Sequence, residues 1–487
     1  MEINDLTPAE QQVWRAFSTG ATVDFLEGAD EDVAEGASWG PERTVRAAVL
    51  RALLLNGPQE PGEVAALRLS GARITGKLSL IYAGVDHAVR LSDCYFDEAL
   101  DLYSSRLRQL NLRGSVFPAL TLGSSHIDAP LRLTGCRARG VVKLGGMRIA
   151  NAVFLDDAEI TAPDAGIPAL QLNQTSIGHD FWAPGLRVHG EMRLTGATVA
   201  GLVNLERAEL RDSGGTALRA DGLDAQADVR ARGLRAHGRI ELRGAHVAGR
   251  VDLSGSHLLN PDGTALRASS AVIGELWLYG SDPIEGTLNL RRSRIEVLNF
   301  EPEVLPGDVR LNNLSYTTLN PNRPADERLP MLKNDGDGYV PYAYEQLTNA
   351  YRRIGDDHAA RLVQLAKLRR LRSTRAWYGR LWGYLQDATV GYGFRPLWAC
   401  AWLLSLLAVG SITYTLHHPP ALKPSEAPHF NPVFYTLDLL LPVISFGQEE
   451  AFAPDGWYQY LAYALIITGW ILATTVVTGV TRTVSRQ

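Results

Sequence analysis

The chain has 487 residues, enough for two or three domains, and a formal net charge of -5 at pH 7. This small negative charge argues against a nucleic-acid partner, because phosphate backbones are bound by basic surfaces. The three cysteines, Cys94, Cys136 and Cys400, are scattered, with no CxxC pair and no metal-ligand spacing, so the sequence predicts no metal site and no cofactor.

Residues 1–66 predict a helical N-terminal cap. Thr7, Pro8 and Glu10 form a helix start, and Pro41 precedes a second apolar run in which Val45 and Val49 fall on one helical face. The first ten residues are acidic and contain no apolar run, so we expect no signal peptide.

Residues 67–320 contain a different periodicity. Pairs such as Leu67/Leu69 and Leu78/Leu80 recur every 10 or 11 residues, and another apolar or small residue follows each pair five positions later. A period of five fits neither an α-helix nor a flat strand. It fits a right-handed, four-sided parallel β-solenoid with one inward residue per side, about 20 residues per coil and about 11 coils. These residues resemble the pentapeptide-repeat family, which implies the same fold.

Three steps of this repeat are longer than the others and end at Leu170, Leu218 and Leu266, each 48 residues after the last. We expect their inserts to stack as a ridge on one side of the solenoid. The ridge suits an unidentified cytoplasmic protein or ligand, and tolerated surface insertion is the alternative. Basic and acidic residues nearly balance along the solenoid, which argues against mimicry of DNA.

Residues 321–342 predict a linker rich in Pro, Asn, Asp and Gly, and residues 343–393 predict an amphipathic helical hairpin and a pre-membrane segment. The hairpin ends in a basic cluster that would bind anionic lipid or fix membrane topology. The potassium-channel filter sequence TVGYG occurs at 389–393, but it precedes any span, so we interpret it as the turn into the first span.

Residues 394–487 predict a domain with two transmembrane helices. The runs 397–416 and 460–480 lack charges, and about 20 residues match a hydrocarbon core of roughly 30 Å. A pair of buried core helices is the alternative. Lysines and arginines flank both runs on their outer sides, so the positive-inside rule predicts a two-pass protein of the cell membrane with both termini cytoplasmic.

Residues 431–448, between the two spans, predict a re-entrant pore loop. Asn431 can cap a short helix, Pro432 fits its first turn and Pro442 ends it. From Asn431 onward the chain resembles two-transmembrane, potassium-channel-type pores. The resemblance implies a hinge at Gly469 and a filter at Val443, Ile444, Ser445, Phe446, Gly447 and Gln448. Ser445 replaces the first filter glycine of that family, and Gln448 replaces its acidic residue.

Further residues are assigned to the pathway. Glu449 and Glu450 would ring the outer mouth. Asp438 in the pore helix would pair near the filter, because an ionisable group at membrane depth is functional by default. Thr474, Thr475 and Thr478 would line the lower pore or pack between helices.

The predicted fold class is therefore mainly β plus membrane α, and three functions remain open. The first is a homotetrameric cation channel in the lipid bilayer, with permeant cations as ligands and a cytoplasmic solenoid as sensor or partner-binding domain. The second is a non-conducting, membrane-anchored scaffold. The third is a membrane-associated oxidoreductase, a label that similar sequences often carry. The chain contains no dinucleotide fingerprint and no catalytic group that would support an enzyme.

Overall fold

The computed structural model describes residues 5–28, 31–162, 164, 166–280, 282–374, 396–423, 427–441 and 444–484, without the side chains of 213–214, 373–374, 396–400 and 475–484. The chain forms two compact units, Met1–Ala350 and Tyr351–Gln487. The TVGYG segment at 389–393, Pro442 and the predicted filter residue Val443 lie outside the described residues.

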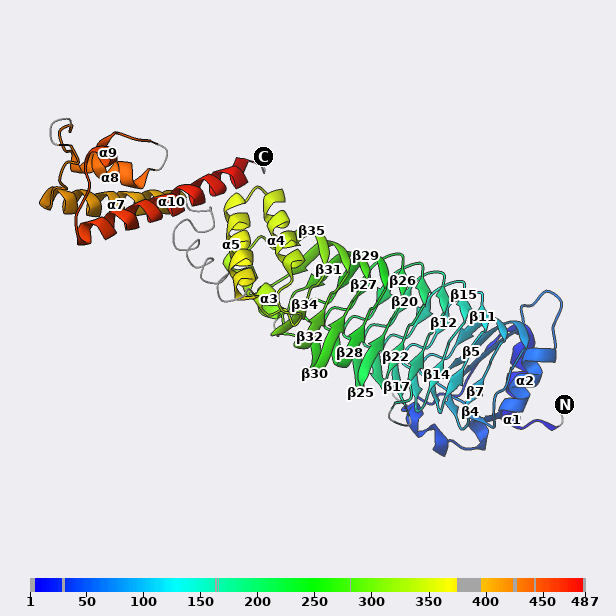
Figure 1. Cartoon of the computed structure of the whole chain (residues 1–487). Helices are drawn as coiled ribbons and strands as arrows, with labels where there is room; N and C mark the ends of the chain where they lie inside the picture. The colour runs from blue at the N-terminus through cyan, green and yellow to red at the C-terminus, as the bar shows by residue number, and fades with distance from the viewer. Residues whose placement is uncertain are drawn as a thin grey trace. The chain divides into compact units, whose positions relative to one another are not determined.

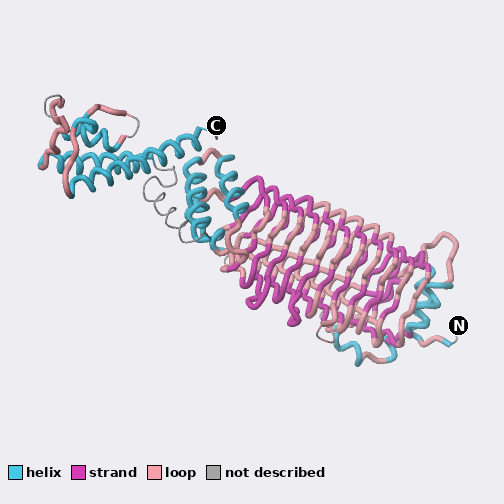
Figure 2. Tube along the Cα trace, viewed as in Figure 1, coloured by secondary structure: helices cyan, strands magenta, loops and turns pink. Residues whose placement is uncertain are grey.

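The first unit contains two long parallel sheets that form a β-solenoid (Figures 1 and 2). One sheet contains β1 (Thr22–Asp24), β3 (Ala66–Ser70), β5 (Gly84–Ser92), β8 (Arg106–Asn111), β11 (His126–Ile127), β12 (Leu131–Arg132), β15 (Arg148–Ile149), β16 (Val153–Phe154), β19 (Ser176–Ile177), β20 (Phe181–Trp182), β23 (Thr198–Val199), β24 (Val203–Asn204), β26 (Asp224–Ala225), β27 (Val229–Arg230), β29 (His246–Asp252), β31 (Val272–Leu278), β33 (Arg294–Phe300) and β35 (Ser315–Asn320). The other contains β2 (Thr44–Arg46), β4 (Arg73–Thr75), β6 (Tyr95–Phe96), β7 (Leu100–Asp101), β9 (Val116–Phe117), β10 (Leu120–Thr121), β13 (Arg137–Ala138), β14 (Val142–Lys143), β17 (Glu159–Thr161), β18 (Leu170–Gln171), β21 (Arg187–His189), β22 (Met192–Arg193), β25 (Glu209–Arg219), β28 (Arg235–Glu241), β30 (His257–Arg267), β32 (Glu285–Asn289) and β34 (Asp308–Arg310).

The apolar repeat forms the core of this solenoid. Leu120 pairs with Val142, and Leu170 pairs with Met192, so an ordinary coil takes 22 residues. These four side chains are fully buried, as are the other apolar positions of the repeat. Each stacked coil thus buries its inward residues against the coils beside it. The structure confirms a β-solenoid of about 11 turns, which is consistent with a pentapeptide-repeat fold.

The corners of the coils share one backbone conformation. Residues with φ between 51° and 71° recur at steps of mostly 10 or 11 residues. Within the coils they are Gly71, Tyr82, Asp93, Ser104, Gly114, Ser124, Gly135, Gly146, Asp157, Gln174, Gly185, Gly196, Arg207, Gly222, Gly233, Gly244, Gly255, Ser270, Arg292 and Asn313. Each lies in a tight turn between two sides of a coil. A residue in the left-handed backbone conformation lets the chain change direction there within a few residues.

The three longer steps form inserts at one corner of the solenoid, as the 48-residue spacing predicts. The coil that follows each insert places a glycine beneath it: Gly190, Gly238 and Gly286, with φ of 122°, 119° and 121°. A Cβ on Gly190 would meet Ala162 and Ala169, and one on Gly286 would meet the backbone of Asn260 and Gly263. These glycines leave the space in which the inserts pack.

The N-terminal end of the solenoid is capped by α1 (Pro8–Thr19) and α2 (Ala47–Asn56) (Figure 1). Thr7 and Glu10 form the capping box of α1. The helix expected from Pro41 differs from the structure: a 3-10 turn (Pro41–Arg43) leads into β2, and α2 starts at Ala47. β1 and β2 pair with β3 and β4, because β-branched residues such as Val23 and Val45 can extend the two sheets by another coil.

The other end of the solenoid is covered by α3 (Ala325–Lys333) and α4 (Pro341–Arg353) (Figure 1). Leu332 and Ala343 of these helices, with Leu298 and Phe300 of β33, line an apolar cavity beneath the cap. Short 3-10 turns at Val33–Ser38 and Pro302–Val304 complete the unit.

The second unit is helical. It contains α5 (Asp357–Thr374), which follows a break at Gly355, then α7 (Pro396–Leu416), α8 (Pro432–Leu440), α9 (Gln448–Ala451) and α10 (Trp457–Val484). α7 and α10 coincide with the runs expected to be spans. Among the described residues, no helix has both the length and the apolar character that a membrane crossing requires.

Candidate functional site

The predicted pore loop starts with a short helix whose first turn is fixed by its cap. The side chain of Asn431 accepts hydrogen bonds from the amides of Val433 and Phe434, at 3.0 and 3.3 Å, and Pro432 occupies the first turn. These residues satisfy amides that have no partner within the helix. α8 then runs to Leu440 and packs against both α7 and α10.

Asp438 joins α8 to the loop that follows it. Its side chain is buried, and its carboxylate accepts hydrogen bonds from the amides of Phe446 (2.5 Å), Gln448 (2.7 Å) and Glu449 (3.2 Å). Three donors to one carboxylate offset its loss of hydration and hold the segment before α9 against the helix. Asp438 therefore positions the predicted filter segment.

Gln448 forms the base of the same loop. Its side-chain oxygen accepts from the amide of Asn431 at 3.1 Å, and its side-chain nitrogen donates to the carbonyl of His429 at 3.3 Å. Gly447, immediately before it, has φ 77°, so the chain turns into α9 through the left-handed region. The Gln448 side chain is buried, so this predicted filter residue ties the two ends of the loop together.

The remaining described residues of the loop face outward. Ile444, Ser445 and Phe446 are exposed, with 53% of Ile444 and 45% of Phe446 accessible. Glu449 and Glu450 are also exposed, on α9, next to the segment that Asp438 holds. An exposed apolar segment beside two carboxylates can take part in contacts between copies of the chain and can attract cations.

Gly469 lies where α10 crosses α8. A Cβ at this position would collide with the carbonyl group of Leu440, so the absence of a side chain lets the two backbones approach closely. Thr474, the first of the three predicted pore threonines, bonds back to the carbonyl of Trp470 at 2.8 Å and is exposed. Thr475 and Thr478 lie on α10, and their side chains are outside the described residues.

A small aromatic and aliphatic core fixes α8 in the unit. Tyr414 of α7 packs edge-on against Tyr435 of α8, with ring centroids 4.9 Å apart, and its hydroxyl donates to the carbonyl of Tyr458. Leu439 and Leu465 are buried in the same cluster. Together with Asp438, this packing gives the loop a defined place between the two long helices.

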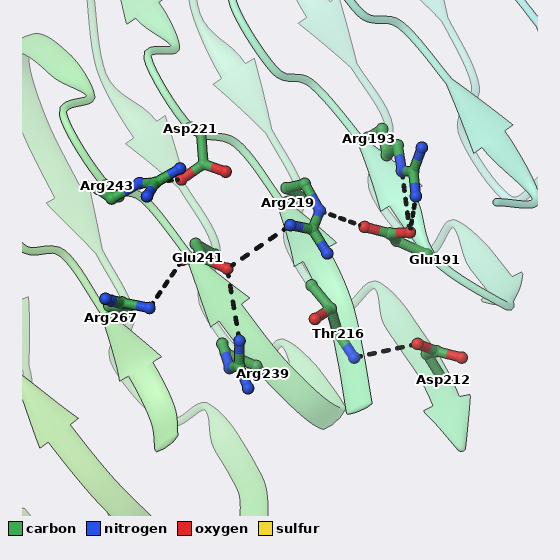
Figure 3. A network of polar contacts seen from close by, with 10 residues as sticks. All are labelled: Glu191, Arg193, Asp212, Thr216, Arg219, Asp221, Arg239, Glu241, Arg243 and Arg267. Carbon is green, nitrogen blue, oxygen red and sulfur yellow. Dashed lines mark hydrogen bonds and ion pairs between the residues drawn. The ribbon is translucent and has the colours of Figure 1, made fainter. Parts of the chain in front are cut away.

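A second candidate site is a network of arginines and glutamates on the solenoid (Figure 3). Arg193 and Arg219 are direct neighbours on β22 and β25, and both contact Glu191, whose side chain is only 9% exposed. The distances to the Glu191 oxygens are 2.7 Å from Arg193 Nη2 and 2.5 Å from Arg219 Nε.

Glu241 forms the second centre of this network, and it is buried. Arg267, Arg239 and Arg219 lie 3.3, 3.7 and 4.0 Å from its oxygens (Figure 3). Four arginines thus share two glutamates, which leaves an excess of two positive charges. Arg243 and Asp221 form a separate pair at 3.2 Å and add no net charge.

A surface hollow adjoins Arg193 and Arg219 and encloses about 950 Å³ of space open to solvent. Asn173, Gln174, Thr195 and Gly196 complete its lining. The buried oxygens Asn173 Oδ1 and Thr195 Oγ1 have no hydrogen-bond partner within the described part of the chain. Because two guanidinium groups line it, the hollow has the electrostatic character of a binding site for an anion.

The contacts of this network shift the pKa values of Glu191 and Arg219. Burial alone would raise the pKa of Glu191, but the hydrogen bonds from Arg193 and Arg219 outweigh it, and the net pKa lies below the ordinary value. Arg219 has a raised pKa, chiefly because of its hydrogen bond to Glu191. The pair therefore remains ionised at neutral pH.

Sequence reasoning missed the arginine network. Its members are separated by up to 76 positions, from Glu191 to Arg267, and only the coil register brings them together. A signal was present in the repeated inserts, since Arg219 and Arg267 both follow an Ala-Leu pair at the same point of the 48-residue spacing. The hydrogen bonds of Gln448 to the chain before α8 were also missed.

No protein-family model, curated protein or solved structure matches this chain.

Proposed function

We propose that the chain forms an oligomeric, cation-channel-like membrane protein, a homotetramer whose pathway is lined by residues 431–448. The observation that supports this proposal is the set of three hydrogen bonds that the carboxylate of Asp438 accepts from the amides of Phe446, Gln448 and Glu449. These bonds fix an outward-facing segment next to a short capped helix. A loop of this kind between two long helices suits a pore when several copies meet around one axis.

The surface of the helical unit is suited to contact with lipid or with other copies of the chain. Large apolar side chains are exposed along both long helices: Trp402, Leu404, Val409, Ile412 and Leu416 on α7, and Trp457, Tyr460, Tyr463, Ile467 and Trp470 on α10. Apolar surface of this extent is uncommon on a soluble monomer and indicates contact with lipid or with other copies. In the proposal, the chain crosses the cell membrane twice, both termini are cytoplasmic, and the solenoid acts as a sensor or partner-binding domain.

Cation preference follows from the acidic residues of the loop. Glu449 and Glu450 of each copy would form a ring of carboxylates at the mouth, and such a ring attracts cations and repels anions. Ser445 replaces a glycine of the potassium filter, so we propose a cation pathway without strict potassium selectivity.

The experiment that tests this function is recording from the purified full-length chain in planar bilayers under K⁺, Na⁺ and Cl⁻ gradients, with the copy number measured by mass photometry in detergent. We expect tetramers and a cation conductance that falls in Glu449→Gln. The matched control is Asp455→Asn, which removes an exposed acid outside the loop. A single copy in detergent, or silent bilayers from tetrameric protein, would contradict the proposal.

A non-conducting membrane scaffold is the second candidate, and two contacts favour it. Gly469 packs against Leu440, which suits a fixed crossing better than a moving hinge, and Gln448 is buried in the base of the loop. A tetramer that is silent in bilayers but retains a specific partner on the solenoid would establish this function instead.

A further inference from the structure

One half of a solenoid sheet carries a surplus of arginines. Within the sheet that starts with β1, the strands from β1 to β16 contain two acidic residues, Asp24 and Asp86. Their six arginines, which we call the arginine band, are Arg68, Arg90, Arg106, Arg108, Arg132 and Arg148. The strands that continue this sheet, from β19 to β35, contain three arginines and four acidic residues. The surplus of positive charge is therefore confined to the first half of the sheet.

The coil register places the arginine band on one continuous surface. One column of paired positions contains Arg68, Arg90, Asn111 and Arg132, and a second contains Arg106, His126 and Arg148. The two columns lie side by side because the single strand β8 belongs to both (Figure 1). Five of the six arginines are exposed. Arg132 is half-buried, and its guanidinium group lies 4.2 Å from the centre of the Phe154 ring.

The arginine band is not neutralised by the described part of the chain. None of its six members forms an ion pair with another described residue. On the other sheet, by contrast, Arg73 pairs with Asp97 and Lys77 with Asp101, each at 3.0 Å. Because neighbouring coils lie about 4.8 Å apart, the like charges of the band repel one another. A partner that supplies negative charge would relieve this repulsion.

We propose that the arginine band binds an extended acidic segment of another protein. The inference rests on the partner-binding role that the proposed function gives to the solenoid, and it does not require conduction. The coils of Arg68 and Arg148 are four steps apart, about 19 Å, which about six residues span in an extended conformation. Arginine also suits carboxylates, because its planar group can donate two parallel hydrogen bonds to one of them.

Two features favour a protein segment over other polyanions. Asp86 and Asp128 are exposed on the coils of the band and can accept N–H groups of a peptide backbone. A phosphate backbone offers only acceptors, so these two carboxylates would repel it. A flat bilayer would also cover the rest of the sheet, where acidic residues outnumber arginines and oppose contact with anionic lipid.

The test is fluorescence anisotropy of dye-labelled hexaglutamate with the full-length chain in detergent, at low and at physiological ionic strength. We expect hexaglutamate to bind, with an affinity that falls as salt is added, and hexaglutamine not to bind. Absence of binding to hexaglutamate at low salt would overturn the proposal. Tighter binding of hexathymidylate or of short-chain phosphatidylserine would assign the band to a nucleic acid or to lipid instead.

Variants locate the surface. The double variant Arg106→Gln, Arg148→Gln removes two exposed charges that have no ion pair within the described residues, so its melting temperature should not fall. We expect its affinity for hexaglutamate to fall at least about threefold, because two exposed charge pairs are lost. The control is Arg235→Gln, Arg294→Gln, which removes two equally exposed arginines outside the band. Equal loss in the control, or unchanged affinity in the band variant, would overturn the assignment.

Mass photometry of the same variants tests a second copy of the chain as the occupant. A copy number that falls in the band variant alone would assign the band to contacts between copies and overturn its role toward another protein. We expect the copy number to stay the same. Because peptide binding is measured without a bilayer, failure of hexaglutamate to bind and failure of the chain to conduct are separate results.

Discussion

Asp438 Oδ2 accepts the amide of Gln448 at 2.7 Å, across ten residues of chain, and so closes the loop between α8 and α9. The side chain of Gln448 in turn accepts the amide of Asn431, the cap of α8. These two contacts connect both ends of the short helix to one point of the loop. The loop is thereby defined by polar contacts as well as by apolar packing.

The first prediction concerns Asp438→Asn. An amide group retains one oxygen, so up to two of the three bonds from Phe446, Gln448 and Glu449 are lost and the new NH₂ group faces donors. We expect local stability to fall by about 1.5–3 kcal/mol for each hydrogen bond that is lost, which is the usual contribution of a hydrogen bond to a charged group. Hydrogen exchange at residues 444–450 measures it, with Asp455→Asn as control. Unchanged protection would show that the carboxylate does not hold the loop.

The second prediction concerns a corner of the solenoid. Gly222 has φ 61°, and a Cβ there would meet no atom within 4 Å, so Gly222→Ala isolates the backbone cost. We expect about 1–2 kcal/mol of destabilisation in urea unfolding, because the left-handed region is unfavourable for residues with a Cβ. Gly307→Ala is the control, since Gly307 has equal space and no positive φ. If both variants unfold at the same urea concentration, the corner conformation does not limit stability.

The third prediction concerns pH. The pKa of Glu191 is lowered in the folded chain, so its contribution to stability is fully present above the ordinary glutamate pKa of about 4.3 and is lost as pH falls through the folded value. Glu191→Gln should therefore be less stable than the unmodified chain at pH 7, and this difference should shrink on acidification below about pH 4.

Urea midpoints at a series of pH values measure this effect, with Glu206→Gln as control. Glu206 lies 4.0 Å from Arg232 and is less buried than Glu191. A stability difference for Glu191→Gln that does not change with pH would contradict the assigned ion pairs.

The fourth prediction concerns the thiols of the solenoid. Cys94 and Cys136 are fully buried, and burial raises the pKa of each thiol to about 12. Thiolates are the reactive form, so neither cysteine should react with a disulfide reagent at pH 8 until the chain unfolds. The Cys400→Ser protein isolates these two thiols. Labelling of the native protein at the rate of an unfolded control would show that the coils open readily.

The solenoid was predictable because apolar residues such as Leu120 and Leu170 recur at a regular spacing. Each coil buries these residues in the same way, so the spacing alone indicates the fold. The capped helix at Asn431 followed from its cap and its proline. The roles of Glu191 and Gln448 were not predictable, because their partners are set by coil register and by a loop closure over many residues. The prediction of a helix starting at Pro41 was wrong because residues 44–46 pair with β4 at the edge of the sheet. This pairing outweighs the helical preference of the segment.

Gly190, Gly238 and Gly286 recur at an interval of 48 residues with nearly the same φ, and each lies beneath an insert of the same spacing. The natural unit of this stretch is consequently a pair of coils, one with an insert and one that accommodates it. If such a pair of coils is duplicated or deleted, the coils on either side of it can still pair with each other. The solenoid can therefore lengthen or shorten by two coils while the helices that cap its two ends stay the same.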